Sequence, residues 1–322
     1  MRSFLRTLLV AAACLVAALS ALADEFPSRP VKIIVPYPAG GIADFVSRNL
    51  AERLSKTWNV AVIVDNRPGA SGNIGTAAIA RADADGYTLG YVATQHVTAP
   101  ALFAQLPFAL SDFRALTIPV QFRLGLLATP GLKANSVPEL IAMLKESPGK
   151  YTVAHAGPTT NNYLWLKTFE QVTGTRLLAV PYKGSSAAYP DLIAGNVDLM
   201  FDAPSMVMPL VKSGKMKVLA VGGSGRSPLA PETPTLEESG FAVGRFMTGW
   251  NAVLVPAKTP PTIADKIERD IVAALKDPAL RAKLQGAGLE VVASSSAQAN
   301  ALIDSEAKRL AEVIRSNGVK AD

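Results

Sequence analysis

The sequence predicts an α/β protein with mostly parallel sheets, and three observations lead to this fold class. Short runs rich in β-branched residues alternate with longer amphipathic segments, which is the pattern of strands joined by crossover helices. Loops rich in Gly, Ser, Thr, Pro and Asn follow several of these runs, as expected where a strand turns into a helix. The chain has 322 residues, a length that favours two domains over one.

Six apolar runs are expected to form strands. They are Val31–Val35, Val60–Val64, Tyr87–Ala93, Leu177–Val180, Val197–Phe201 and Met216–Val221. Between the first two runs, Val46, Leu50 and Leu54 recur at helical spacing. In parallel sheets, ligands bind beyond the carboxyl ends of the strands. The loops that follow these runs are therefore the places where a binding site is expected.

The first 23 residues are expected to be a secretory signal peptide, cleaved after Ala23. Arg2 and Arg6 form a basic start, residues 8–19 are almost wholly apolar, and Ala21-Leu22-Ala23 fits a cleavage site. A membrane-spanning helix needs about 20 apolar residues, and this run is shorter. The only cysteine, Cys14, lies in this segment, and a lipid attached to it is the alternative. A mature chain without cysteine suits the bacterial periplasm, where apolar burial stabilises the fold instead of disulfides.

Composition excludes several classes of function. Without a cysteine after residue 23 there is no thiolate nucleophile and no cysteine-ligated zinc, and no other metal or cofactor motif is present. The formal net charge of +6 includes Arg2 and Arg6, so it falls to +4 after cleavage, and the basic residues are scattered. We therefore expect no metal, no cofactor and no nucleic-acid partner.

Five loops have the composition of a ligand site, and each precedes an expected helix start. They span residues 36–41 (PYPAGG), 93–98 (ATQHVT), 154–162 (AHAGPTTNN), 181–186 (PYKGSS) and 201–205 (FDAPS). Helix N-termini present unpaired N–H groups and partial positive charge, so several of them converging hold a carboxylate without an arginine. Gly40 and Gly41 let the backbone approach a small anion, since neither has a Cβ. The alternative is that they only form a tight turn.

Four segments give the chain a family resemblance. They are residues 35–89, which begin VPYPAGGIADF, residues 180–205 (VPYKGSSAAYPDLIAGNVDLMFDAPS), residues 214–240 (GKMKVLAVGGSGRSPLAPETPTLEESG) and residues 256–288, which begin PAKTPPTIADKIERD. In this order they resemble the tripartite tricarboxylate transporter receptors, the TctC or Bug family of extracytoplasmic solute-binding proteins. The resemblance covers nearly the whole mature chain.

The resemblance implies a two-lobed fold of the periplasmic binding protein type II kind, with a hinged ligand cleft between the lobes. Lobe 1 would comprise residues 24–125 and 250–322, and lobe 2 residues 126–249, with crossings near Arg123–Ala128 and Trp250–Val255. The implied function is periplasmic capture of a small organic carboxylate by a monomer. The receptor delivers that ligand to a membrane permease of one large and one small subunit, driven by an ion gradient.

The family's binding residues carry over to positions in both lobes. In lobe 1 they are Tyr37, Ala39, Gly40, Gly41, Asp44 and Thr94; in lobe 2 they are His155, Ala156, Gly157, Thr159, Thr160, Tyr182, Lys183 and Asp202. The segment AHAGPTTNNY departs from the family pattern, which is closer to Ala-Ser-x-Gly-x-Gly-Ser, so the identity of the ligand stays open. The segment RPGASG around Gly69 is expected to lie away from the cleft.

Some of these side chains have a second interpretation. Asp44 has three possible roles: it stabilises a helix N-terminus, it contacts an amine or hydroxyl of the ligand, or it orients the glycine loop. Lys183 either neutralises an anion or faces solvent. His155 would make binding sensitive to pH near 6 to 7. His96, which is also in a loop, is either a second histidine of the site or only a surface residue.

Two other classes of function remain open. A periplasmic sensing module would need the same closing cleft as a transport receptor. An enzyme on the same fold has little support, because the chain has no dinucleotide fingerprint, Walker loop or nucleophile elbow. A triad assembled from distant loops is not visible in one sequence.

Overall fold

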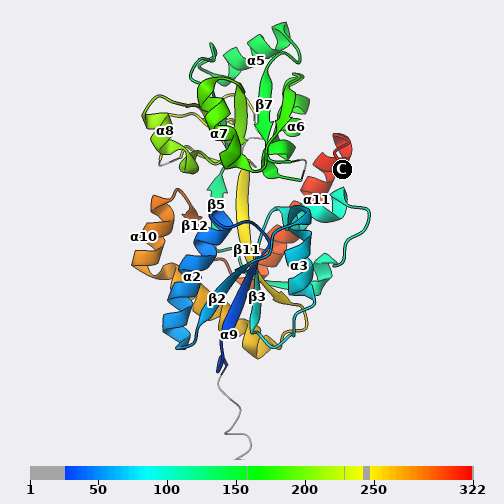
Figure 1. The fold of residues 1–322 in the computed structure, drawn as a ribbon, viewed down its shortest axis with the longest axis vertical. Helices are drawn as coiled ribbons and strands as arrows, with labels where there is room; N and C mark the ends of the chain where they lie inside the picture. Colours follow the sequence, from blue (N-terminus) through cyan, green and yellow to red (C-terminus); the bar gives the residue numbers. More distant parts are fainter. Residues whose placement is uncertain (1–25, 158, 228, 242–246, 321–322) are drawn as a thin grey trace, which may run out of the picture.

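The computed structural model describes residues 26–157, 159–227, 229–241 and 247–320. These residues form two lobes, one above the other in Figure 1. The expected signal peptide, with Cys14 and the cleavage site after Ala23, lies outside the described residues. Within the described ranges, no helix is both long and apolar enough to cross a bilayer.

Lobe 1 is built on a seven-stranded sheet with the order β12-β5-β11-β3-β1-β2, and β4 also pairs with β11. Its strands are β1 (Val31–Val35), β2 (Val62–Asn66), β3 (Thr88–Ala93), β4 (Phe113–Thr117), β5 (Val120–Arg123), β11 (Thr248–Pro256) and β12 (Glu290–Val291). Its helices are α2 (Ile42–Trp58), η1 (Ala70–Gly72), α3 (Asn73–Ala80), α4 (Gln95–Leu102), η2 (Leu110–Asp112), α9 (Pro261–Lys276), α10 (Pro278–Gly286) and α11 (Ser296–Ser316).

Both faces of this sheet are covered. The apolar stripe of α2, including Val46, Leu50 and Leu54, packs with α9 and α10 in one core cluster. Helices α3, α4 and α11 contribute to a second cluster on the other face. Burial on both faces explains why β1 is an almost uninterrupted apolar run.

Lobe 2 is built on a five-stranded sheet with the order β10-β6-β9-β7-β8. Its strands are β6 (Gly125–Ala128), β7 (Thr152–His155), β8 (Leu178–Pro181), β9 (Leu199–Asp202) and β10 (Lys217–Val221). Its helices are α5 (Val137–Glu146), α6 (Asn161–Thr173), α7 (Ser185–Ala194), η3 (Pro204–Met206) and α8 (Met208–Lys212). Residues of α5 and α6 pack in one cluster, and residues of α7 in another.

Two strands carry the chain between the lobes. The chain leaves lobe 1 after β5 and enters lobe 2 at β6, with Leu124 between them. It returns as β11, whose first residues pair antiparallel with β5. The Leu124 N–H donates to the Met247 carbonyl at 3.0 Å. A Cβ at Gly249 would lie 2.2 Å from the Phe122 ring, so only glycine lets the two crossing strands approach this closely.

The α/β architecture is confirmed, and all six expected strand regions overlap observed strands. The expectation of mostly parallel sheets needs correction, because both sheets are mixed. Pairs β1–β2, β1–β3, β7–β8 and β7–β9 are parallel, whereas β11 is antiparallel to β3, β4 and β5. In lobe 1 the reason is the path of the chain. Strand β11 enters lobe 1 from the side that faces lobe 2, and β3 ends at that side, so the two strands run in opposite directions.

Candidate ligand-binding site

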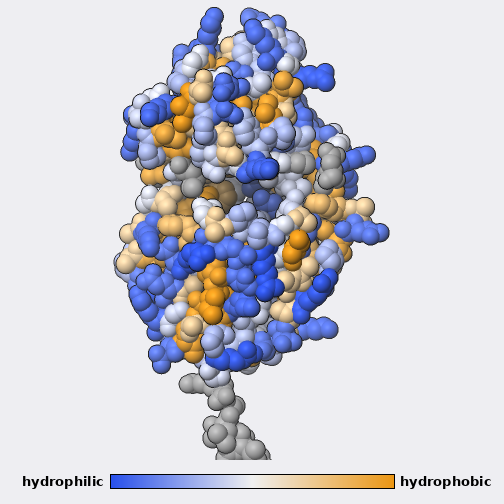
Figure 2. Space-filling view, in the orientation of Figure 1, coloured by the Kyte–Doolittle hydropathy of each residue, from blue (hydrophilic) through white to orange (hydrophobic). Residues whose placement is uncertain are grey.

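The five loops expected to form a site come together between the lobes. Three hydrogen bonds join four of them in series: Ala93 N–H to Tyr37 Oη (2.9 Å), Asn161 Nδ2 to Thr94 Oγ1 (3.3 Å) and Asn162 Nδ2 to Ser185 Oγ (3.4 Å). The second of these bonds crosses from lobe 2 to lobe 1. The fifth loop is held to α7, where Tyr189 Oη donates to Asp202 Oδ2 at 2.8 Å. Figure 2 shows a recess between the two lobes on this face of the molecule.

The glycine loop before α2 is held by Asp44. Residue Asp44 is only 5 % exposed. Its Oδ2 accepts a hydrogen bond from the Gly40 amide at 3.0 Å, and its Oδ1 accepts one from Arg48 Nε at 2.9 Å. Burial alone would raise the pKa of Asp44, but hydrogen bonds from Arg48, the Gly40 amide and Asn66 outweigh it and hold the pKa below its usual value. Both carboxylate oxygens therefore have protein partners, and the hydrogen bond from the Gly40 amide to Oδ2 orients the loop.

Gly40 and Gly41 differ in conformation although both are exposed. Gly40 has a φ of 89°, in the region that favours glycine, while Gly41 is extended, with φ −86° and ψ 178°. A Cβ at either position would meet no atom within 4 Å. Ala39 is exposed beside them. The loop thus presents open backbone, and only Gly40 needs to be glycine for conformational reasons.

Residues 66–75 lie directly against this loop. The expectation that the segment RPGASG lies away from the cleft stays a prediction. The Asn66 side chain donates to the Tyr37 carbonyl at 3.1 Å. A Cβ at Gly72 would lie 3.2 Å from the Tyr37 ring, and one at Gly75 would lie 2.8 Å from the Pro36 Cα. The glycines of this segment allow it to pack closely behind the loop.

His155 and its neighbours form the facing loop of lobe 2. The His155 side chain is 6 % exposed, its Nδ1 accepts the Gly157 N–H at 3.1 Å, and its ring lies 4.6 Å from that of Tyr163. Burial lowers the pKa of His155, the Gly157 hydrogen bond opposes this, and the charge of Lys167 adds to the lowering. The imidazole is therefore neutral near pH 7.

The rest of this loop combines open backbone with ordered hydroxyl groups. Thr160 Oγ1 donates to the Gly157 carbonyl at 2.6 Å and also hydrogen-bonds the Asn162 side chain. Gly157 has a φ of 118° and open space where a Cβ would stand. Ala156 is half-buried and Thr159 is buried. Gly157 in lobe 2 thus resembles Gly40 in lobe 1, because both glycines have a positive φ and open space at the Cβ position.

Three further expected residues have different surroundings. The Tyr182 hydroxyl donates to Asp191 Oδ2 at 2.8 Å, and Lys183 is exposed. Asp202 accepts hydrogen bonds from the Ala203 amide at 2.9 Å and from Tyr189 at 2.8 Å. Burial raises the pKa of Asp202 despite these hydrogen bonds. Tyr182 and Asp202 are therefore tied to lobe 2, whereas Lys183 remains exposed to solvent.

Four helices begin at these loops, and none of them has a capping side chain. No side chain accepts a hydrogen bond at the N-termini of α2, α4, α6 and α7, where the N-cap residues are Gly41, Thr94, Thr160 and Gly184. Helices α5, α10 and α11, which begin elsewhere, are capped by Ser136, Asp277 and Ser295. Helices α3 and α9 also lack a capping side chain. First-turn N–H groups without partners are suited to hold an anion.

His96 is a core residue, so the interpretation that it lies at the surface is wrong. It is 3 % exposed in α4 and lies against the rings of Phe108 and Phe113, at centroid distances of 6.3 and 4.9 Å. Burial lowers its pKa to about 4. Thr94, two residues earlier, is also buried, and it is this residue that receives the bond from lobe 2.

Sequence reasoning missed two groups of residues at the site. Asn161 and Asn162 join three of the loops, and their position in the first turn after the threonine N-cap was the available signal. Asn66 and Arg48 support the glycine loop through Tyr37 and Asp44. Asn66 is distant in sequence from the loop, so no local pattern marks it, whereas the i,i+4 spacing of Asp44 and Arg48 on α2 was the available signal for Arg48.

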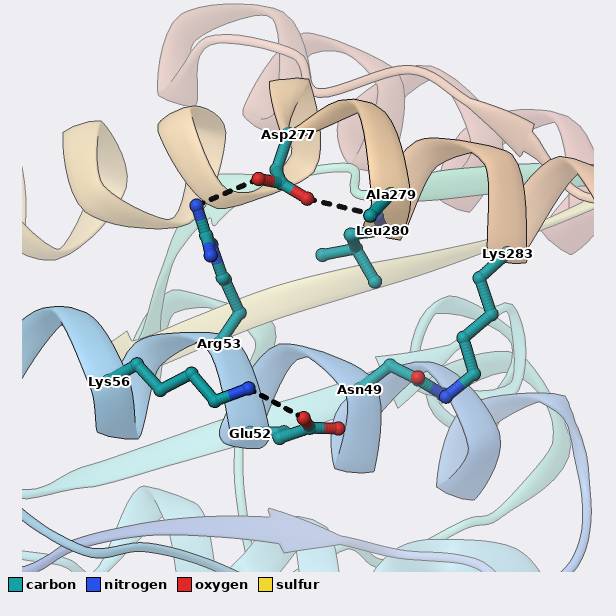
Figure 3. A pocket seen from close by; sticks show the side chains of 8 residues that line it. All are labelled: Asn49, Glu52, Arg53, Lys56, Asp277, Ala279, Leu280 and Lys283. Atoms are coloured by element: carbon teal, nitrogen blue, oxygen red, sulfur yellow. Dashed lines mark hydrogen bonds and ion pairs between the residues drawn. The ribbon is translucent and has the colours of Figure 1, made fainter.

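A separate pocket of about 190 Å³ lies between α2 and α10 on lobe 1. Figure 3 shows two ion pairs among its charged side chains: Arg53 with Asp277 at 2.7 Å, and Lys56 with Glu52 at 2.9 Å. Lys283 also lines the pocket, and Asp277 caps α10. Because both carboxylates of this pocket are already paired with basic side chains and one of them caps a helix, this pocket is not our candidate. Among the described residues, no group of three His, Cys, Asp or Glu side chains is arranged to hold a metal ion.

Comparison with known proteins gives the family. Residues 46–319 match the model of the tripartite tricarboxylate transporter family receptor, TctC. Protein BugT of Bordetella pertussis is 34 % identical over 302 residues, covering 92 % of each chain.

Solved structures share the two-lobed fold. The periplasmic binding protein BugD is 31 % identical with a TM-score of 0.82, covering 92 % of this chain and all of BugD. MatC of Rhodopseudomonas palustris with bound malate is 26 % identical with a TM-score of 0.80, covering 90 % of this chain and all of MatC. R. palustris Rpa4515 with adipate is 28 % identical with a TM-score of 0.84, covering 92 % of this chain and all of the other. The chain belongs to the tripartite tricarboxylate transporter receptor family of periplasmic solute-binding proteins.

Proposed function

We propose that this protein is a periplasmic receptor that captures a small organic carboxylate between its lobes and delivers it to a tripartite secondary transporter. The observation that carries the proposal is the hydrogen-bonded series that joins four loops from both lobes, crossing between lobes at Asn161 and Thr94. Uncapped helix N-termini begin at these four loops. A carboxylate is the ligand chemistry that such a set of N–H donors favours.

The ligand would be held mainly by backbone groups. Gly40 and Gly41 on lobe 1 and Gly157 on lobe 2 offer open approaches, and none of the candidate residues is an arginine. Among the candidate residues, only Lys183 carries a positive charge, and only His155 becomes positively charged when it is protonated. Two relatives bind dicarboxylates, malate in MatC and adipate in Rpa4515, which supports a short dicarboxylate as the first ligand to test.

The transporter would comprise one large and one small membrane subunit, and the receptor would act as a monomer exported by a signal peptide cleaved after Ala23. We place lobe 1 at residues 24–125 and 250–322 and lobe 2 at residues 126–249. This division agrees within a few residues with the passage from β5 to β6 and the return at β11. Mass spectrometry of the periplasmic fraction should find a chain that starts at Asp24. A retained leader or a lipid on Cys14 would contradict the export proposal.

Binding is tested with the mature protein and a panel of malate, adipate, citrate and aspartate. A ligand at 100 times its dissociation constant should raise the free energy of unfolding by about 2.7 kcal/mol, which a thermal-shift assay detects. Absence of stabilisation by every carboxylate would refute the proposed ligand class. Conversion of a bound ligand to a product, followed by NMR, would show instead an enzyme on this fold.

A further inference from the structure

A second cavity lies between the lobes, next to the crossing strands. In lobe 1 it is found at the β12–β5 edge of the sheet, whereas the lobe 1 loops of the candidate site follow β1 and β3, beyond β11. Its volume is about 440 Å³, within the range of about 300 to 1,000 Å³ that is typical of small-molecule sites. Pro204 and Ser205 belong to the fifth loop of the candidate site, residues 201–205, so the cavity adjoins the candidate site there; its other lining residues lie outside the five loops.

Both lobes contribute to the walls. From lobe 1 come Phe122 and Arg123 of β5 and Gln285, Gly288, Leu289 and Glu290 of the α10–β12 connection; from lobe 2 come Pro204, Ser205, Arg226, Ser227 and Leu229. The lobes touch beside the cavity at Gly288, where a Cβ would lie 2.1 Å from the Ser205 Cβ and 2.6 Å from Leu229 Cδ1. A change in the angle between the lobes therefore changes this cavity.

The cavity has one fixed positive charge without a carboxylate partner. Arg123 Nη1 donates to the Gly222 and Gly225 carbonyls at 3.1 and 2.7 Å, which holds the guanidinium in place. Within the described part of the chain, no carboxylate forms an ion pair with Arg123. Because carbonyl oxygens carry only partial charge, the guanidinium remains available to an anion.

The other charged groups limit which anion fits. Arg226 is already paired with Glu238, whose carboxylate oxygens lie 3.2 and 3.0 Å from its Nε. Glu290 lines the cavity and is exposed, so its carboxylate disfavours a ligand with several negative charges. One fixed guanidinium and one acidic wall together favour a ligand with a single carboxylate.

The uncharged walls define the rest of the ligand. Phe122, Pro204, Leu229 and Leu289 provide apolar surface. Ser205 Oγ is buried and has no hydrogen-bond partner among the described residues, which leaves it able to donate to a ligand oxygen. A buried polar atom of this kind is normally satisfied in a working complex.

We propose that this hinge cavity is a second binding site, for a monocarboxylate with a compact aromatic or branched aliphatic body. The carboxylate would meet Arg123 and the Ser205 hydroxyl, and the apolar body would lie against Phe122 and Leu229. Because residues of both lobes line the site, its occupant is linked to the angle between the lobes and thereby to the candidate site. The inference does not depend on which carboxylate the candidate site binds.

The test uses phenylacetate as the probe and phenylacetamide as its uncharged counterpart, both measured by isothermal titration calorimetry with the mature protein. Leu229→Trp fills the hinge cavity, and Gly41→Trp obstructs the candidate site at a position where a side chain meets no atom. Leu178→Trp is the matched control, because Leu178 is 54 % exposed on β8 and lines neither site. Circular dichroism verifies that each variant is folded.

We expect phenylacetate to bind wild type, Gly41→Trp and Leu178→Trp alike, and to lose at least tenfold in affinity for Leu229→Trp. Phenylacetamide should bind wild type at least tenfold more weakly than phenylacetate. Binding of malate or adipate should show the opposite dependence: it should be lost in Gly41→Trp and kept in Leu229→Trp. This difference separates the inference from the proposed function. If Leu229→Trp does not fold, Ser205→Ala replaces it and should weaken phenylacetate severalfold.

Three results would overturn the proposal. If wild type does not bind phenylacetate, the site does not exist. If Gly41→Trp abolishes phenylacetate binding, the probe occupies the candidate site. If Leu229→Trp and Ser205→Ala both bind phenylacetate as tightly as wild type, the probe binds elsewhere on the molecule.

Discussion

Replacing Gly41 by valine separates ligand approach from turn formation. Gly41 has a φ of −86°, which valine adopts without strain, and an added Cβ would meet nothing within 4 Å. Valine is a poorer N-cap residue than glycine, but it also restricts the unfolded chain, and each effect amounts to at most about 1 kcal/mol. The two effects oppose each other, so the folded protein should keep nearly all of its stability.

The expected loss is in binding. The branched side chain would occupy the space from which a carboxylate reaches the first N–H groups of α2. Each hydrogen bond to a charged group contributes about 1.5 to 3 kcal/mol, so losing one lowers affinity by about 10- to 150-fold. Calorimetric titration with malate and adipate measures this loss, and thermal denaturation measures stability.

Gly131→Val is the matched control for this experiment. Gly131 lies in lobe 2 between β6 and α5, is exposed, has no positive φ, and has open space at the Cβ position. Gly69 is unsuitable as a control, because its φ is 124° and a Cβ would lie 2.6 Å from Ile74 Cδ1. Wild-type affinity in folded Gly41→Val would show that the two glycines serve only the turn, and the reasoning about backbone approach would be wrong.

Three other predictions concern the side chains around the site. Asp44→Asn should weaken malate and aspartate together, by tenfold or more in calorimetry, because it disturbs the bond to the Gly40 amide; a loss for aspartate alone would point to direct contact with an amine. His96 has a folded pKa of about 4 and an unfolded pKa near 6.5, so stability falls as pH drops through this window. Between pH 7 and pH 4, the free energy of unfolding measured with urea should therefore fall by about 3 kcal/mol less in His96→Phe than in wild type. An equal fall in both proteins would refute the lowered pKa of His96. A double-mutant cycle with Thr94→Ala and Asn161→Ala should give a coupling of about 0.5 to 1.5 kcal/mol in malate binding, whereas zero coupling would mean that their bond is irrelevant to the ligand.

The position of the candidate site was predictable because it follows from where strands end. An apolar run such as Val31–Val35 marks a buried strand, and the loop after it must lie at the carboxyl edge of the sheet. The direction of β11 was not predictable, since its residues are equally apolar whichever way the strand runs. Only the path of the chain through lobe 2 determines that direction.

The roles of individual side chains were harder to predict, because they depend on backbone conformation and on tertiary contacts that hydrophobic patterns do not specify. Asp44 was left with several interpretations, and its bond to the Gly40 amide depends on the positive φ of Gly40. His96 was misplaced because the rings that enclose it come from Phe108 and Phe113, in a segment without a regular apolar period. Its burial is a tertiary effect that the local sequence does not encode.

The central place of β11 has a consequence for chains that end too early. The described strands of the lobe 2 sheet lie within residues 125–221, so that sheet needs no residue of β11 or of the segments after it. The lobe 1 sheet does need them, because β11 lies between β3 and β5, and α9, α10 and α11 follow it. Without β11, β3 and β5 present unpaired edges, which favour aggregation. A chain truncated before β11 would therefore have all the strands of the lobe 2 sheet but only part of the lobe 1 sheet.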